Sequence, residues 1–189
     1  KGYWLGVLDR FNYLSQAIGQ AKLPEVESWA TDFLNGQGAH SKIVIYSYHK
    51  MVVTRLVKAL AEWGVLTIVG DTKSADRDRA ATLFQSNTDH RVMIISSAGS
   101  IGIDLFGRGD IDVSNVLLTE LPWRPADVDQ IAGRLHRLGQ VLPVTLWMME
   151  ALGSIDELIV QRLLAKDRII ADVIGDHSII RGIIETWRD

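Results

Sequence analysis

The chain has 189 residues, and 47% of them are hydrophobic, which suits a domain with a core and excludes a disordered chain. A formal net charge of −3 excludes a broad basic surface, so any nucleic-acid contact must be local. Cysteine is absent and the five histidines lack metal-ligand spacing, so we expect no disulfide and no metal site. No apolar run is long enough to span a membrane, and we expect an intracellular protein without a membrane partner.

The first 40 residues favour two helices. Apolar residues recur at intervals of three and four between Trp4 and Ile18, and Pro24 suits the first turn of a second helix. The segment 35–38, NGQG, then breaks the helical pattern. Because the chain starts without Met and reads as the interior of a longer protein, we interpret residues 1–40 as a helical lead-in from a preceding lobe.

Beyond this lead-in, short apolar segments rich in β-branched residues alternate with helical ones. Such alternation predicts an α/β fold, with a mostly parallel central sheet covered by helices on both faces. Gly64 is expected to close one of these helices and Ser74 to cap the next. Ligands bind beyond the carboxyl ends of parallel strands, so the segments after the strands are the functional candidates. The predicted strands are 43–48, 65–69, 92–96, 115–119 and 144–149, and the candidate segments are 48–50, 70–72, 97–104 and 120–123.

A further helix is predicted over residues 125–139, with a polar face beside an apolar one. Two arginines one turn apart suit an anion with several oxygens. Spacing alone favours the alternative, which is a solvated face or ion pairs with Asp127 or Asp104. The polar face consists of Gln130, Arg134 and Arg137. The apolar face, which we expect to be buried, consists of Val128, Ile131, Leu135 and Leu138.

The last long helix is predicted to begin after Ser154, which forms the spacing of a capping box with Glu157. The segment 155–158, IDEL, superficially resembles an acidic metal-binding box. It starts a helix, however, whereas such a box ends a buried strand, and we therefore reject that interpretation. The predicted organisation is a lead-in (1–40), a lobe (41–152) and a terminal helix with a tail (153–189).

Several segments match helicase motifs in order. They read IVIYSYHK at 43–50, GDT at 70–72, SSAGSIGIDL at 96–105 and LPWRPADVDQIAGRLHRLGQ at 121–140. Together they resemble the second lobe (helicase C-terminal domain) of superfamily-two helicases, and the likeness is strongest to Swi/Snf-type ATP-dependent DNA translocases. This resemblance implies a RecA-like three-layer sandwich, in which the helix at 153–170 braces the lobe. Ser100 and Asp104 depart from it, because Swi/Snf-type enzymes usually have Gly and often Asn there.

The resemblance implies that ATP with Mg²⁺ binds between two lobes and is held mainly by the first lobe of the same polypeptide. The chain has no Gly-Lys-Ser/Thr phosphate loop, so we expect the fragment alone to be inactive. By motif match, Arg134 and Arg137 are arginine fingers that offset charge on the transferring γ-phosphoryl group, and Gln130 positions them or a water. The backbone at Gly102 and Asp104 comes close to the nucleotide or to the first lobe, although Asp104 equally suits a cap of the next element.

The same resemblance implies a sequence-independent contact with duplex DNA. Side chains and amides beyond the strand ends would hold phosphates, and ordinary helix capping is the alternative for each of them. Trp123 would couple the DNA groove to the two arginines, or else pack in the core. Other functions left open are a non-catalytic binding module for nucleic acid or protein and a lobe of an RNA helicase. The remaining candidate DNA-binding residues are Tyr48, His49, Thr72, Ser97 and Ala98.

Overall fold

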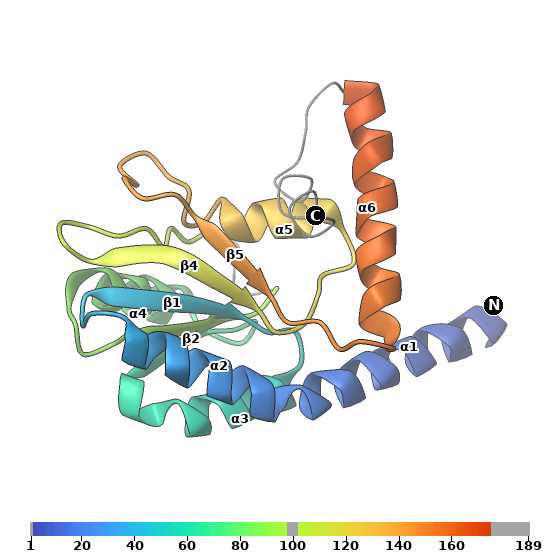
Figure 1. Ribbon diagram of the computed structural model, residues 1–189, viewed down its shortest axis with the longest axis horizontal. Helices are drawn as coiled ribbons and strands as arrows, with labels where there is room; N and C mark the ends of the chain where they lie inside the picture. The colour runs from blue at the N-terminus through green and yellow to red at the C-terminus, as the bar shows by residue number, and fades with distance from the viewer. Residues whose placement is uncertain (1, 98–101, 175–189) are drawn as a thin grey trace.

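The computed structural model describes residues 2–97 and 102–174 (Figure 1). Strands and helices alternate from residue 41 onward, as predicted, and two helices precede them. The helices are α1 (Gly2–Ala21), α2 (Leu23–Gly36), α3 (Lys50–Ala59), the short 3-10 helix η1 (Ala61–Trp63), α4 (Ser74–Ser86), α5 (Pro125–Ala132) and α6 (Ile155–Ile174). The strands are β1 (Ser41–Tyr46), β2 (Val65–Ile68), β3 (Val92–Ile95), β4 (Asp112–Leu118) and β5 (Thr145–Met148).

The strands form one parallel sheet in the order β2-β3-β1-β4-β5. The central strand β1 is paired on both sides, with Ile43 opposite Val92 in β3 and opposite Asn115 in β4. A strand buried on both faces requires a continuous apolar run, which explains the sequence of β1 and β3. The carboxyl ends of all five strands therefore lie along one edge of the sheet.

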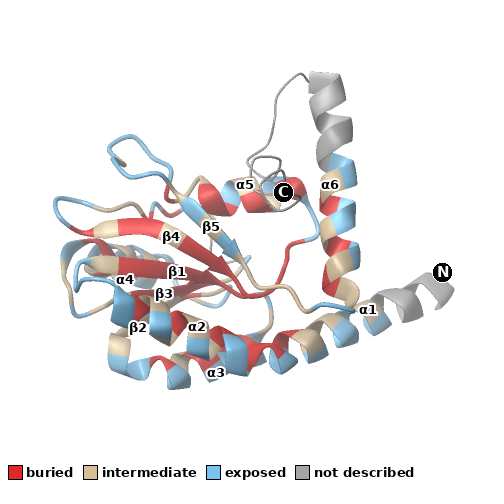
Figure 2. Cartoon of the chain, in the orientation of Figure 1, coloured by how far each residue is buried: buried red, intermediate tan, exposed pale blue. Residues whose placement is uncertain are grey.

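Helices cover the sheet on both faces and make three layers (Figure 2). Alternate side chains of β1 point to opposite faces. Ile43 and Ile45 pack with α2 and α3, whereas Val44 and Tyr46 pack with α4, α5 and α6. The α/β sandwich predicted from the sequence is confirmed. Because α2 contributes to the core, the boundary expected after residue 40 has no counterpart in the packing and stays a prediction.

The helix predicted over residues 125–139 is wrong in its second half, since α5 ends at Ala132. At Arg134 and Leu135 the backbone bonds shorten to three-residue steps, with the N–H of Leu135 donating to the carbonyl of Ala132, and at Arg137 the step is two residues. This tighter winding ends the helical periodicity. Arg134 and Arg137 therefore do not share a helical face, and Leu138, which we expected to be buried, is fully exposed.

Two predicted helix starts differ from the structure in their capping. Lys73 is the N-cap of α4 and makes no side-chain cap bond, so the prediction that Ser74 is the cap is wrong. At α6, the hydroxyl of Ser154 accepts the N–H of Asp156 (3.1 Å), and Glu157 accepts the N–H of Gly153 (2.7 Å). Both acceptors serve amides one residue earlier than in a regular capping box.

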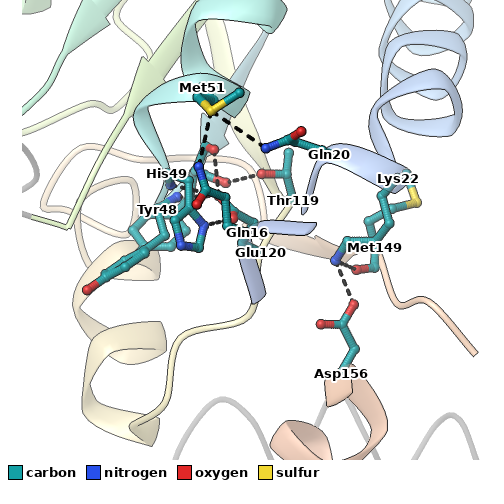
Figure 3. Close-up of polar contacts among 12 residues, drawn as sticks. Gln16, Gln20, Lys22, Tyr48, His49, Met51, Thr119, Glu120, Met149 and Asp156 are labelled. Carbon is teal, nitrogen blue, oxygen red and sulfur yellow. Dashed lines mark hydrogen bonds and ion pairs between the residues drawn. The ribbon is translucent and has the colours of Figure 1, made fainter. Parts of the chain in front are cut away.

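A buried ion pair joins α6 to the junction between α1 and α2. The Nζ of Lys22 lies 2.7 Å from Oδ2 of Asp156, and both side chains are 6% exposed. Lys22 also donates to the carbonyl of Met149 after β5 (2.8 Å), as Figure 3 shows. Asp156 therefore has a structural partner, in agreement with our rejection of IDEL as a metal box. Within the described residues, no helix is both long and apolar enough to cross a membrane.

Candidate functional site

Two neighbouring cavities open at the carboxyl-end edge of the sheet. The larger one, about 540 Å³, lies beyond β1, β2 and β3 and is lined by Lys50, Gly70 and Asp71 among others. The smaller one, about 250 Å³, reaches Trp123 and the start of α5. Tyr48 and Ser97 line both. The structure thus places two of the predicted DNA-binding residues together at the predicted edge.

An exposed ion pair spans residues of the larger cavity. The Nζ of Lys50 lies 2.6 Å from Oδ2 of Asp71, and both side chains are about four-fifths exposed. Through a hydrogen bond and its charge, Lys50 lowers the pKa of the Asp71 carboxyl below its ordinary value. Exposed pairs of this kind contribute little to stability, so an anion entering the cavity would compete for Lys50 at small cost.

Glu120, two residues after β4 ends at Leu118, organises the segment that follows β1. The carboxylate is buried, and its Oε2 accepts the hydroxyl of Ser47 (2.8 Å) and the backbone N–H groups of Tyr48 (2.7 Å) and His49 (3.0 Å). Its Oε1 contacts Nδ1 of His49 (Figure 3). Sequence analysis missed this role. The sequence signal for a buried role was the position of Glu120, an acidic residue between the apolar run of β4 and the apolar residues that follow it.

The predicted DNA-binding residues are placed differently from one another. The amides of Tyr48 and His49 and the Nδ1 of His49 are engaged by Glu120, whereas the Tyr48 ring points away from Glu120 (Figure 3). Thr72 accepts the N–H of Val69 through its hydroxyl (3.0 Å), which is a turn contact ahead of α4 and not a helix cap. Ala98 lies outside the described residues.

Ser97 is tied to the end of β1 through Tyr46. Burial raises the pKa of the Tyr46 phenol to about 12, and a hydrogen bond with the Ser97 side chain opposes this shift. Both residues line the smaller cavity. The Ser97 hydroxyl therefore sits where β1 and β3 end.

Trp123 lies beside the smaller cavity between two helices that project past the sheet. Its ring meets Phe11 of α1 edge to face, with centroids 5.8 Å apart. Its carbonyl accepts Nζ of Lys166 in α6 (3.2 Å). The ring is 39% exposed, so Trp123 is not a core residue, and the alternative of core packing is wrong.

The predicted nucleotide-binding residues come together at the end of α5. The N–H of Leu105 donates to the carbonyl of Arg134 (2.7 Å), and the Arg134 guanidinium donates to the carbonyl of Ile103 (3.3 Å). The Arg137 guanidinium pairs with Asp104 (2.8 Å) on the surface. The structure thus joins the segments 96–105 and 121–140, through contacts between residues about 30 positions apart in sequence.

The alternative expected for the two arginines, ion pairs with Asp127 or Asp104, forms in part. Arg137 forms an ion pair with Asp104, whereas Asp127 is engaged by two nitrogens of Arg124 (2.9 and 2.6 Å). Arg134 keeps a buried Nε without a hydrogen-bond acceptor among the described residues. A buried guanidinium N–H that lacks an acceptor fits an anion supplied from outside the chain.

Two further predicted residues flank this cluster. Gly102 has a φ of +77°, a backbone conformation that favours glycine, although a Cβ there would meet nothing within 4 Å. Gln130 lies on α5, one turn before Arg134, with its side chain exposed. At position 102 the positive φ, and not a lack of space for a side chain, therefore requires glycine.

Comparison with known proteins assigns this geometry to a family. Residues 26–139 match the model of the helicase conserved C-terminal domain. The chain is 27% identical over 155 residues to the SWI/SNF-related matrix-associated actin-dependent regulator of chromatin subfamily A-like protein 1 of Bos taurus, covering 81% of the chain and 16% of that protein. It is 27% identical over 164 residues to the chromatin-remodeling ATPase INO80 of Cryptococcus neoformans, covering 86% of the chain and 9% of that protein.

Solved structures agree on the fold. The C-terminal part of the Fun30 ATPase domain superposes with a TM-score of 0.59 at 29% identity, covering 65% of this chain and 39% of that one. The E. coli DEAD-box protein SrmB, crystallised with the regulator of ribonuclease activity A, superposes with a TM-score of 0.58 at 20% identity over 82% of each chain, which shows the fold alone.

Fold and site thus define a RecA-like lobe of the helicase type. The chain belongs to the helicase conserved C-terminal domain family. It spans 16% and 9% of the length of the two curated relatives described above. The activity of the whole protein is therefore a matter of proposal.

Proposed function

We propose that this chain is the second motor lobe of a Swi/Snf-type ATP-dependent translocase on double-stranded DNA, in which Arg134 and Arg137 act on ATP. We call these two arginines, together with Asp104, the finger cluster. The observation that carries the proposal is this cluster itself, in which the buried Nε of Arg134 lacks an acceptor among the described residues. The relatives named for SWI/SNF and for chromatin remodelling support the assignment.

The cluster is suited to charge stabilisation. When a γ-phosphoryl group transfers, negative charge spreads over its oxygens, and arginine fingers accelerate such steps by about 10³–10⁵-fold, or roughly 4–7 kcal/mol. Arg134 would donate its free Nε, and Arg137 would exchange Asp104 for phosphate oxygens. Gln130, exposed on α5, would order the arginines or a water.

The nucleotide and its metal would be held mainly by a first RecA-like lobe of the same polypeptide. Among the described residues, no group of three or more His, Cys, Asp or Glu side chains could hold a metal ion. Bound Mg²⁺ would neutralise charge on the β- and γ-phosphates, and the chain described here would contribute guanidinium groups and, near Gly102, backbone. Closure of the lobes around ATP would complete the site, and hydrolysis would let the lobes part.

The cavities at the strand ends would form the DNA groove. Lys50, the Tyr48 ring and the Ser97 hydroxyl line them and suit the sugar-phosphate backbone, whose contacts carry no base information. Trp123, at the far end of this groove, leads directly into α5 and the arginines. We infer that the protein works where cellular DNA is, in the nucleus or nucleoid.

The test uses the full-length protein that contains this chain. Arg134→Ala and Arg137→Ala are expected to lower DNA-stimulated ATP turnover by about 10³-fold or more while the dissociation constant for duplex DNA changes little. Arg79→Ala, on the exposed side of α4, is the matched control and should leave turnover unchanged. Undiminished turnover in both finger variants would refute their role. Stimulation by duplex RNA in place of DNA would favour the RNA helicase alternative.

A further inference from the structure

The segment between β1 and α3 has only three residues, 47–49, and Glu120 bonds to all of them. Two consecutive backbone amides donate to one carboxylate oxygen, which fixes the orientation of both peptide planes. His49 precedes α3 without any side-chain cap bond of its own. Glu120 thus sets the position from which the Tyr48 ring and Lys50 reach the larger cavity.

Helix α1 closes the other side of the same carboxylate. A Cβ at Gly19 would lie 2.6 Å from Oε1 of Glu120 and 3.2 Å from Cγ2 of Val52, so only glycine allows this approach without movement of a neighbour. Gln16 and Gln20 donate from the same helix to Sδ of Met51 (3.1 and 3.6 Å), as Figure 3 shows. The end of α1 therefore holds Glu120 and the first turn of α3 in place.

We propose that Glu120 is a positioning residue for nucleic-acid binding, which holds the Tyr48–Lys50 segment against the backbone of the bound strand, and that α1 sets its position through Gly19. This inference rests on the function proposed above. It assigns no contact with DNA to Glu120 itself, since the carboxylate is 3% exposed beneath the segment that it holds.

The acceptor oxygens of Glu120, and not its negative charge, carry this role. In Glu120→Gln, the amide oxygen can accept the hydroxyl of Ser47 and both backbone N–H groups, as Oε2 does now. The amide nitrogen would then donate to Nδ1 of His49, which accepts in its neutral Nε2–H tautomer. In Glu120→Leu, a side chain of similar bulk leaves the two amides without an acceptor.

The first experiment measures the dissociation constant for random-sequence duplex DNA and the KM for ATP with the full-length protein. Glu120→Leu is expected to raise the DNA dissociation constant about tenfold with an unchanged KM for ATP, whereas Glu120→Gln stays within about twofold of the wild type in both. Loss of structure in Glu120→Leu would raise the KM for ATP together with the DNA dissociation constant, so an unchanged KM separates the positioning role from misfolding. If Glu120→Gln loses as much DNA affinity as Glu120→Leu, the hydrogen-bond argument is overturned.

The second experiment approaches the carboxylate from α1 and does not depend on whether Glu120→Leu folds. Gly19→Ala inserts a methyl group against Oε1 in a helix that alanine otherwise favours, so the variant should fold and bind DNA several-fold more weakly. Gly36→Ala is the matched control, since it lies in α2 and a Cβ there meets nothing within 4 Å. Equal DNA affinity in the two glycine variants would overturn the role of α1.

The two proposals fail in distinguishable ways. If the wild-type protein neither binds duplex DNA nor hydrolyses ATP in response to it, the proposed function is wrong. If it does both, and Glu120→Leu and Gly19→Ala match it in DNA affinity, the motor assignment stands and the positioning role is refuted.

Discussion

Lys42 is a lysine in an apolar setting at the start of β1. Its side chain is fully buried, its Nζ donates to the carbonyls of Phe84 and Asn87, and it lies 5.0 Å from the centroid of the Phe84 ring. Burial lowers the pKa of its ammonium group to about 8, with Asp89 opposing the shift and Arg91 adding to it. The side chain thus binds the last carbonyls of α4 in place of a glycine cap.

The lowered pKa makes stability depend on pH. Between pH 8 and 10.5 the unfolded chain binds more protons at this site than the folded one, so the free energy of unfolding rises with pH. Above pH 10 the raised pKa of Tyr46 acts in the opposite direction, which leaves pH 8 to 10 as the window. Urea unfolding at pH 7.5, 8.5 and 9.5 should show this rise in the wild type and a smaller one in Lys42→Met. An identical rise in the variant would contradict the assignment.

At the scale of the elements, the Lys22–Asp156 pair fixes α6 to the α1–α2 junction. Both charges are buried, and Asp156 also accepts the N–H of Ala151 (3.1 Å). Removing one partner of a buried pair leaves an uncompensated charge, which is far more costly than replacing both partners with apolar residues.

We therefore expect Lys22→Met to lower the free energy of unfolding by about 3–5 kcal/mol, and Lys22→Met with Asp156→Leu to recover most of that loss. Urea midpoints in a double-mutant cycle measure the coupling. Lys50→Met, which breaks the exposed pair with Asp71, is the matched control and should cost less than about 1 kcal/mol. Additive losses from the two buried sites would show that the pair is not coupled.

Most elements could be predicted from the sequence because their patterns are local. The prediction failed where one apolar pattern is compatible with two different backbone structures. Apolar residues at Val128, Ile131 and Leu135 suit one long helix, and they equally suit a helix followed by tight turns, which is what forms. The end of α5 depends on the bonds that Arg134 makes to residues 103–105, and periodicity contains no information on these. The motif singled out the two arginines, and their catalytic role stays a prediction, whereas the expectation that they share one helical face is wrong.

At the scale of the whole molecule, strand and helix alternation was sufficient to predict a parallel sheet covered by helices on both faces, and two cavities lie at the edge that it marks for ligands. The strand order and the partners of Glu120 and Lys22 were not predictable. The contacts of Glu120 and Lys22 join positions 71 to 134 residues apart, and a single sequence shows no pattern at that range. Glu120 thus fell within a candidate segment after a strand, but its contacts, like those of Lys22, were not predicted.

With a net charge of −3, nucleic-acid binding must depend on the few cations of the groove, and their contribution can be counted. The logarithm of the association constant should fall linearly with the logarithm of salt concentration, with a slope of about −0.9 for each neutralised phosphate. Lys50→Ala should weaken binding to all duplex sequences and make this slope shallower by about 1. Lys58→Ala, at the other end of α3, should leave the slope unchanged. Equal slopes for the two variants would show that Lys50 makes no contact with a DNA phosphate.

The ion pair between Arg137 and Asp104 has a consequence for the end of a catalytic cycle. If Arg137 is a finger, Asp104 is an anion that the lobe itself offers to the same guanidinium. Both side chains are about half exposed, so the pair is weak enough for a triphosphate to displace. When cleaved phosphate departed, the carboxylate would take its place, so the arginine would keep a counter-charge. On the function proposed above, Asp104 would thereby favour product release and oppose rebinding, and the resting ion pair would help to clear the nucleotide site.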